Sequence, residues 1–277
     1  MSPKYKVIPD KDYIIRQLPS PENGTGMGYV ISACDGKNFV IDGGSEESRE
    51  LLLSLIRENC GGEVAAWFIT HPHPGHVGAL CSILEDFPED IKISKIFHSP
   101  LSMENIEKYE PQSLPFVKRW LSALKAFSGC KKVSVNSDVR LKVGKTIVRV
   151  VAAGDIGGYT EDYINNCGVV YKFEMFCTSV LFLGDIGRDA SIAILESKEK
   201  KAMLNCDIIQ IANHGRPGVL SEVYYLASPN TCLWSTPKSV GDKNPYTSEL
   251  RSILELSDAT EHYFSGTDGL SEIKIVY

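Results

Sequence analysis

The sequence predicts an α+β protein in which two mixed β-sheets pack together, with helices on their outer faces. Short apolar runs typical of strands open the chain, helical segments are embedded between them, and the second half repeats this pattern. No linker rich in Pro, Ser or Gly separates the halves, and 277 residues suit one large domain. We therefore expect a single domain over residues 1–277.

Composition narrows the class of protein. The apolar content of 43% and charged content of 23% are ordinary for a soluble globular chain, and the net charge of -6 disfavours an extended nucleic-acid footprint. The start of the chain lacks a signal-like apolar core, and no apolar stretch approaches the length of a membrane span. The eight cysteines occur without a Cys-x-x-Cys pair, which indicates reduced thiols in a cytoplasm.

Periodicity and turn residues define the elements of the first half. The residues Gly43-Gly44 end a strand, and Ser45 is placed to cap a helix that runs to about Asn59. The other elements expected here are strands at 13–18, 28–33, 38–42, 64–69, 95–98, 131–135, 139–143 and 146–152, and helices at 77–87 and 115–127.

A hairpin of two apolar runs, 169–176 and 179–183, is expected to open the second half. The elements expected after it are helices at 190–203, 221–227 and 248–256, strands at 207–212 and 231–235, and two short strands at the C-terminus.

A cluster of histidines is the strongest functional signal. Three of the six histidines, His71, His73 and His76, lie in the run Thr70-His-Pro-His-Pro-Gly-His76, directly after the strand expected at 64–69. A His-x-His pair in an extended loop can direct both rings at one metal ion, and a third ring can serve a neighbouring ion. A polar turn after a strand is the alternative interpretation, which the flanking pattern disfavours.

Three other strands end in candidate ligands. Asp42 ends the strand at 38–42, Asp185 follows the strand at 179–183, and His214 follows the strand at 207–212. Asp185 alone fits a turn and His214 alone fits a helix-cap neighbour. Together with the histidine cluster they predict a site for one or two divalent ions at one edge of a sheet.

These motifs resemble those of the metallo-β-lactamase superfamily. The similarity runs from Asp42-Gly43-Gly44 through the histidine cluster to Leu183-Gly184-Asp185 and Asn213-His214-Gly215. Within the superfamily the chain is most similar to the branch of the competence-type DNA-uptake protein, because of Asn165-Asn166-Cys167 and the run 207–215. The resemblance implies an αββα sandwich.

The resemblance also implies the roles of the site residues. The first metal ion would be held by His71 and His73, the second by His76 and His214, and both by a bridging Asp185. Asp42 would support the loop through a hydrogen bond to a ligand histidine. Zinc is the first choice of metal, with iron or manganese as alternatives.

The chain departs from the family pattern at two ligand positions. Gly75 stands where the family has an aspartate that binds the second ion, so we expect this ion to bind weakly or not at all. The usual third-motif histidine has no counterpart, and the equivalent stretch is 165–167. The residues that could replace the lost ligand are Cys167, Asp155, Glu161 and Asp162, although each also fits as a buried thiol or a solvated loop acid.

The expected activity is hydrolysis of a phosphoester, phosphodiester or cyclic ester by a metal-activated hydroxide, with Asp185 and His214 as catalytic residues. The substrate would be a small molecule or a short phosphodiester. Arg216 is a candidate to bind an anionic substrate group, or is a plain surface arginine. His98 and His262 are expected to be structural.

Two other functions remain open. Gly75 favours a weakly active or inactive relative that binds a ligand or a partner. A thiol or redox protein is the third hypothesis. The oligomeric state is not predicted.

Overall fold

The computed structural model describes residues 12–21, 25–257, 259–265 and 270–275. Two seven-stranded sheets form its centre. The first contains, in spatial order, β16 (Ser271–Ile275), β1 (Tyr13–Gln17), β2 (Gly28–Ser32), β3 (Asn38–Asp42), β5 (Ala66–Phe68), β7 (Lys95–His98) and β8 (Lys131–Ser134). The second contains β15 (Glu261–Phe264), β14 (Thr231–Trp234), β13 (Ile208–Gln210), β12 (Thr178–Phe182), β11 (Val170–Met175), β10 (Thr146–Ala152) and β9 (Arg140–Val143).

Helices and short turns connect these strands. The α-helices are α1 (Arg49–Cys60), α2 (Pro74–Asp86), α3 (Met103–Tyr109), α4 (Leu114–Ala126), α5 (Tyr163–Asn166), α6 (Arg188–Glu196), α7 (Lys198–Ala202), α8 (Ser221–Ala227), α9 (Lys238–Gly241) and α10 (Pro245–Leu256). Three 3₁₀ turns are η1 (Glu46–Ser48), η2 (Pro111–Ser113) and η3 (Ala212–Gly215), and β4 (Glu63–Val64) pairs with β6 (Lys92–Ile93).

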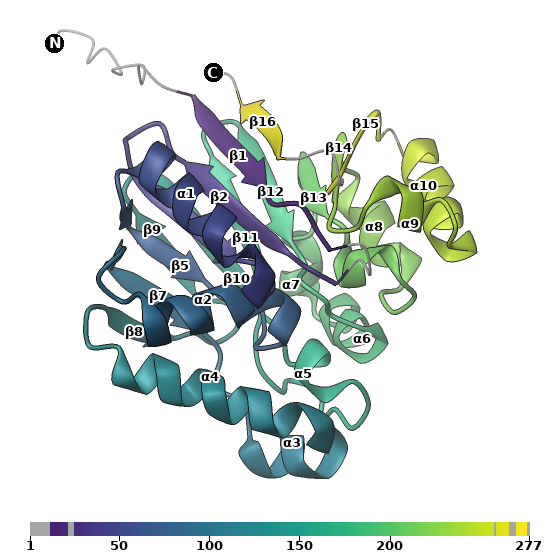
Figure 1. Cartoon of the computed structure of the whole chain (residues 1–277). Helices are drawn as coiled ribbons and strands as arrows, with labels where there is room; N and C mark the ends of the chain where they lie inside the picture. Colours follow the sequence, from purple (N-terminus) through teal and green to yellow (C-terminus); the bar gives the residue numbers. More distant parts are fainter. Residues whose placement is uncertain (1–11, 22–24, 258, 266–269, 276–277) are drawn as a thin grey trace, which may run out of the picture.

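Three apolar layers hold the sheets and helices together. Side chains on facing sides of the two sheets form the central layer, which includes Phe68 from β5 and Phe173 from β11. Alternate residues of the same strands point outward, and there α1, α2 and α4 cover the first sheet while α6, α8 and α10 cover the second. This four-layer order is the predicted αββα sandwich (Figure 1).

The structure differs from several predicted element bounds. The run 64–69 is divided, because Val64 pairs in the small sheet with Ile93 while Ala66–Phe68 pair in the first large sheet. The helix expected at 190–203 is broken at Ser197, whose hydroxyl caps α7 by accepting a hydrogen bond from the Lys200 amide. The strand expected at 207–212 ends at Gln210, since the backbone turns into η3.

Parallel strand pairs bring the predicted site residues to common edges. β3 and β5 are parallel neighbours, so Asp42 and the histidine loop leave the first sheet at the same end. β12 and β13 are also parallel neighbours, which places Asp185 beside His214 in the second sheet. All eight cysteines are free, and no helix in the described part of the chain is long and apolar enough to cross a membrane.

Candidate metal centre

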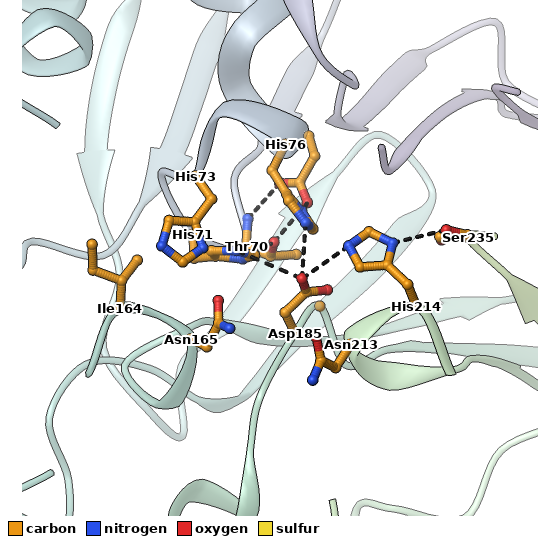
Figure 2. Close-up of polar contacts among 12 residues, drawn as sticks. Thr70, His71, His73, His76, Ile164, Asn165, Asp185, Asn213, His214 and Ser235 are labelled. Atoms are coloured by element: carbon orange, nitrogen blue, oxygen red, sulfur yellow. Dashed lines mark hydrogen bonds and ion pairs between the residues drawn. The ribbon is translucent and has the colours of Figure 1, made fainter. Parts of the chain in front are cut away.

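The predicted ligands from both sheets meet around the carboxylate of Asp185 (Figure 2). Its Oδ2 lies 3.2 Å from His76 Nε2 and 3.0 Å from His214 Nε2. The same oxygen lies 4.0 Å from His71 Nε2. The ring of His73 is 4.8 Å from that of His71, centroid to centroid. Folding therefore gathers the four imidazoles and the carboxylate that the sequence places far apart.

The donor set fits a divalent cation. The ligand atoms of His71, His76 and Asp185 all lie within 4.8 Å of one another, and the three side chains are buried. His71 Nε2 and Asp185 Oδ1 are buried without a hydrogen-bond partner in the protein. Unpartnered buried polar atoms are rare because they lose their interactions with water. Imidazole nitrogen and carboxylate oxygen are the atoms with which proteins bind zinc and related ions.

Asp42 anchors the histidine loop through contacts with Thr70 and His76. Its Oδ1 accepts a hydrogen bond from the Thr70 amide at 2.7 Å. Its Oδ2 lies 2.6 Å from Thr70 Oγ1 and 2.7 Å from His76 Nδ1. The predicted hydrogen bond between Asp42 and a histidine of the site is therefore present: His76 Nδ1 donates it to Asp42 Oδ2.

Thr70 determines the tautomer of His71, and therefore which ring nitrogen has a lone pair available at the centre. The Thr70 hydroxyl has one proton, and it donates this proton to the carboxylate of Asp42. Thr70 Oγ1 must then accept the 3.1 Å hydrogen bond from His71 Nδ1–H. Burial also lowers the pKa of His71 well below its usual value, so the ring is neutral. His71 Nε2 consequently presents an unshared electron pair toward Asp185.

Glu110 orients His73 and was not predicted from the sequence. Its buried Oε1 lies 2.6 Å from His73 Nε2 and accepts a 2.6 Å hydrogen bond from Ser113 Oγ. Its Oε2 accepts a hydrogen bond from the Ile164 amide at 3.0 Å. With Nε2 held by Glu110, Nδ1 is the nitrogen that His73 has left for a metal ion. Nothing in the local sequence distinguishes Glu110 from the exposed acids of α3.

His76 and His214 are tied to Asp185 more tightly than His71 is. Burial would lower the pKa of His76, but Asp185 and Asp42 on either side of the ring raise it to about 10. Burial would raise the pKa of Asp185, but His214 and His76 hold it well below its usual value. A cation bound here must therefore displace a proton from His76.

The backbone at His214 is strained. Asn213 and His214 both have positive φ, 48° and 55°, although neither is glycine. The strained turn aims His214 Nε2 at Asp185, and His214 Nδ1 donates a 2.8 Å hydrogen bond to the Ser235 carbonyl. Such conformations persist where surrounding contacts fix them, and they are common at functional sites.

The space that a side chain at position 75 would need is occupied by the backbone of Thr25. A Cβ atom on Gly75 would lie 1.9 Å from the carbonyl oxygen of Thr25, which is an impossible approach. The Met27 amide also donates a 3.0 Å hydrogen bond to the Gly75 carbonyl. An aspartate therefore cannot be restored here without moving the segment 25–27.

The remaining candidates lie outside the cluster formed by His71, His76 and Asp185. Cys167 lies in the apolar layer behind the second sheet, where burial raises its pKa to about 12. Asp155 accepts hydrogen bonds from the amides of Gly158 and Tyr159 within its own turn. Arg216 is exposed at the end of η3.

Of the other residues considered as replacements for the lost metal ligand, Glu161 and Asp162 are both exposed. His98, which was expected to be structural, lines a small cavity together with His71. His262, the second histidine expected to be structural, accepts a hydrogen bond from Trp234 Nε1.

Part of the chain matches the model of one known protein family. Residues 24–129 match the model of the metallo-beta-lactamase superfamily, which covers the histidine loop and Asp42. Among curated protein sequences, none matches the chain.

Solved structures share the fold at low sequence identity. Zn²⁺-bound PqqB from Methylobacterium extorquens has a TM-score of 0.58 at 11% identity, over 94% of this chain and 99% of that one. A diphosphatase from the PhnP family has a TM-score of 0.54 at 14% identity, over 96% and 99%. CmlA, a diiron β-hydroxylase from Streptomyces venezuelae, has a TM-score of 0.57 at 12% identity; the match covers 98% of this chain but 55% of CmlA.

Residues 24–129 are thus similar in sequence to the metallo-beta-lactamase superfamily, and the chain shares its fold with these solved structures. They do not distinguish the competence-type branch, which stays a prediction.

Proposed function

We propose that the protein is a metal-dependent hydrolase of a phosphoester, phosphodiester or cyclic ester. The observation that carries the proposal is the pair of buried, unpartnered atoms His71 Nε2 and Asp185 Oδ1 beside three further imidazoles. A structural polar cluster would satisfy these atoms within the protein. Their lone pairs are explained if a cation is their partner.

We assign the residues of the site to metal binding, catalysis and substrate binding. His71 and His73 would hold one cation, and His76 and His214 would hold a second, with the carboxylate of Asp185 shared between them. When bound, the cation supplies Lewis-acid chemistry that polarises an ester oxygen and makes water more acidic. Asp185 and His214 are the catalytic residues of the proposal, and Arg216 would bind an anionic substrate group.

Zinc remains our first choice of metal, with iron or manganese as alternatives. PqqB is a Zn²⁺-bound protein and CmlA a diiron protein, which supports a metal at this centre and favours neither element. The diphosphatase among the neighbours favours a phosphate ester as substrate. A fold hosts many activities, so this part of the proposal rests on analogy.

A second function is favoured by one observation. Gly75 lacks the acidic ligand of the family, and the Thr25 carbonyl fills the space that a side chain would need. A site built in this way is also consistent with a weakly active or inactive relative that binds a ligand or a partner.

Metal analysis joined to a hydrolysis assay separates the two functions. Protein is treated with a chelator, reloaded with Zn²⁺, Mn²⁺ or Fe²⁺, and tested on bis(p-nitrophenyl) phosphate and on a lactone. We expect bound metal and hydrolysis, both lost in His71→Ala and both kept in the matched control His262→Gln. Bound metal without hydrolysis of either substrate would favour the binding role, and no bound metal would refute the proposal.

A further inference from the structure

Asn165 carries a third unpartnered atom at the same centre. Its side chain is 8% exposed, and its Oδ1 is buried without a hydrogen-bond partner. The residue lies in α5, a short helix that covers the cluster from the second sheet's side. Figure 2 shows the amide oxygen directed toward the space between His71 and Asp185. Asn165 Oδ1 therefore joins His71 Nε2 and Asp185 Oδ1 as a buried acceptor without a hydrogen-bond partner, and all three residues belong to the group drawn in Figure 2.

The orientation of this amide is determined by its neighbour. Asn165 Nδ2 donates a 3.1 Å hydrogen bond to Asp162 Oδ1. A carboxylate only accepts hydrogen bonds, so the NH₂ group must face Asp162 and the oxygen must face the other way. Asp162 therefore holds Asn165 Oδ1 toward the histidines.

The side-chain amide of the adjacent residue, Asn166, forms hydrogen bonds within the protein through both its oxygen and its nitrogen. Asn166 Oδ1 accepts hydrogen bonds from the amides of Gly187 and Ala190, and its Nδ2 donates to the Glu161 carbonyl. Every polar atom of Asn166 named here has a partner in the protein. Asn165 differs from its neighbour in the one atom that faces the cluster.

The helix that carries Asn165 is tied to the histidine loop. Glu110 bonds His73 Nε2 with one oxygen and the Ile164 amide with the other. The same carboxylate thus fixes His73 and the residue directly before Asn165. This link holds the Asn165 amide and the His73 ring in one relative position.

We propose that Asn165 Oδ1 is a further ligand of the cation held by His71 and His73. This inference rests on the proposed function, because it needs a metal at the centre. A neutral amide oxygen would complete the coordination on the side where the third-motif histidine is absent. Oxygen ligands suit manganese and magnesium better than nitrogen ligands do, so Asn165 would shift the preference of the site toward harder ions.

Metal affinity in an alanine variant tests the role of Asn165. The dissociation constants for Mn²⁺ and Zn²⁺ are measured by chelator competition in wild type, Asn165→Ala and the matched control Asn105→Ala. Asn105 donates to the Tyr163 hydroxyl and so supports the same short helix away from the centre. We expect Asn165→Ala to weaken Mn²⁺ binding by at least about tenfold, and Zn²⁺ binding by less, with Asn105→Ala near wild type.

A spectroscopic readout is independent of activity. Loss of one ligand lowers the coordination number of bound Co²⁺, and its visible absorption then becomes stronger. We expect this increase in Asn165→Ala and not in Asn105→Ala. If Asn165→Ala does not fold, Asn165→Ser replaces it; the shorter polar side chain withdraws the oxygen from the centre and should weaken Mn²⁺ binding in the same way.

The outcomes separate this inference from the proposed function. Wild-type affinity and an unchanged Co²⁺ spectrum in folded Asn165→Ala would overturn the ligand role, while metal binding by wild type would still stand. Wild-type Mn²⁺ affinity in folded Asn165→Ser would overturn it as well. Absence of metal from wild type and from every variant would instead overturn the proposed function on which the inference rests.

Discussion

The two sides of the Asp185 carboxylate are built differently. On one side, defined here as the His71 side, are His71, His73 and Asn165, of which His71 Nε2 and Asn165 Oδ1 have no hydrogen-bond partner in the protein. The ring of His71 also lies 4.0 Å from that of His76, centroid to centroid. On the other, the His214 side, His76 and His214 both contact Asp185 Oδ2 at hydrogen-bond distance.

The difference suggests an order of metal binding. A cation on the His71 side can bind His71 Nε2 and Asn165 Oδ1 without breaking a hydrogen bond, because neither atom has a hydrogen-bond partner in the protein. A cation on the His214 side must first replace the contacts of His76 and His214 with Asp185, and must displace the proton of His76. We therefore expect one tight site and one weak site.

Removal of the shared carboxylate should have the largest effect. In Asp185→Ala both sides lose their common ligand, and His76 and His214 lose their counter-charge. We expect bound metal to fall to near zero when measured by elemental analysis. His214→Ala should retain the tight site, and equal losses in the two variants would contradict the contrast between the sides.

Asp42→Asn should destabilise the whole histidine loop. The buried carboxylate accepts hydrogen bonds from the Thr70 amide, the Thr70 hydroxyl and His76. An amide can accept at only one of its two positions, so we expect a loss of about 3 kcal/mol in the free energy of unfolding by urea. A loss below about 1 kcal/mol would show that the loop does not depend on Asp42.

Gly75→Asp should not create the missing ligand. Because the new Cβ would meet the Thr25 carbonyl at 1.9 Å, we expect about 2 kcal/mol of destabilisation and no additional bound metal. Gly75→Ala should cost about the same, since the clash lies at Cβ. Gly218→Ala is the matched control, because a Cβ there meets nothing closer than 3.5 Å. Added metal in Gly75→Asp would show that the segment 25–27 moves aside.

Glu110→Ala should weaken metal binding on the His71 side by about tenfold, because Glu110 fixes the orientation of His73 through Nε2. Glu110→Gln can still place an oxygen against His73 Nε2 and should retain most of the affinity. Glu107→Ala, an exposed acid of the neighbouring helix α3, is the control. Affinity is read by chelator competition, and equal affinity in all three variants would remove Glu110 from the centre.

Much of the fold could be predicted from local pattern. Long periodic segments such as the helix at 115–127 and the hairpin at 169–183 appear within a residue or two of their expected bounds. Errors occurred where neighbours in space decide, as in the division of 64–69 between two sheets. The short helices α3 and α5 were missed because segments of seven and four residues have too few turns to show a period.

The site could be predicted only as a set of candidate residues. His71, His73 and His76 are concentrated in one loop, and Asp185 and His214 each follow an apolar strand, so chemistry and spacing were enough to select them. Glu110 and Asn165 lack such a signal. Their importance comes from what they face, which depends on contacts across 37 residues in one case and on an unpartnered atom in the other.

The imidazole and carboxylate groups and the strands that carry them could be identified without a structure, because ligand chemistry and hydrophobic periodicity are local properties of the chain. The tertiary structure decided which atom of each group faces the centre, since Thr70, Asp42, Glu110 and Asp162 fix those orientations through hydrogen bonds. It also decided that position 75 has no room for a side chain, because that space belongs to a carbonyl fifty residues earlier in the chain.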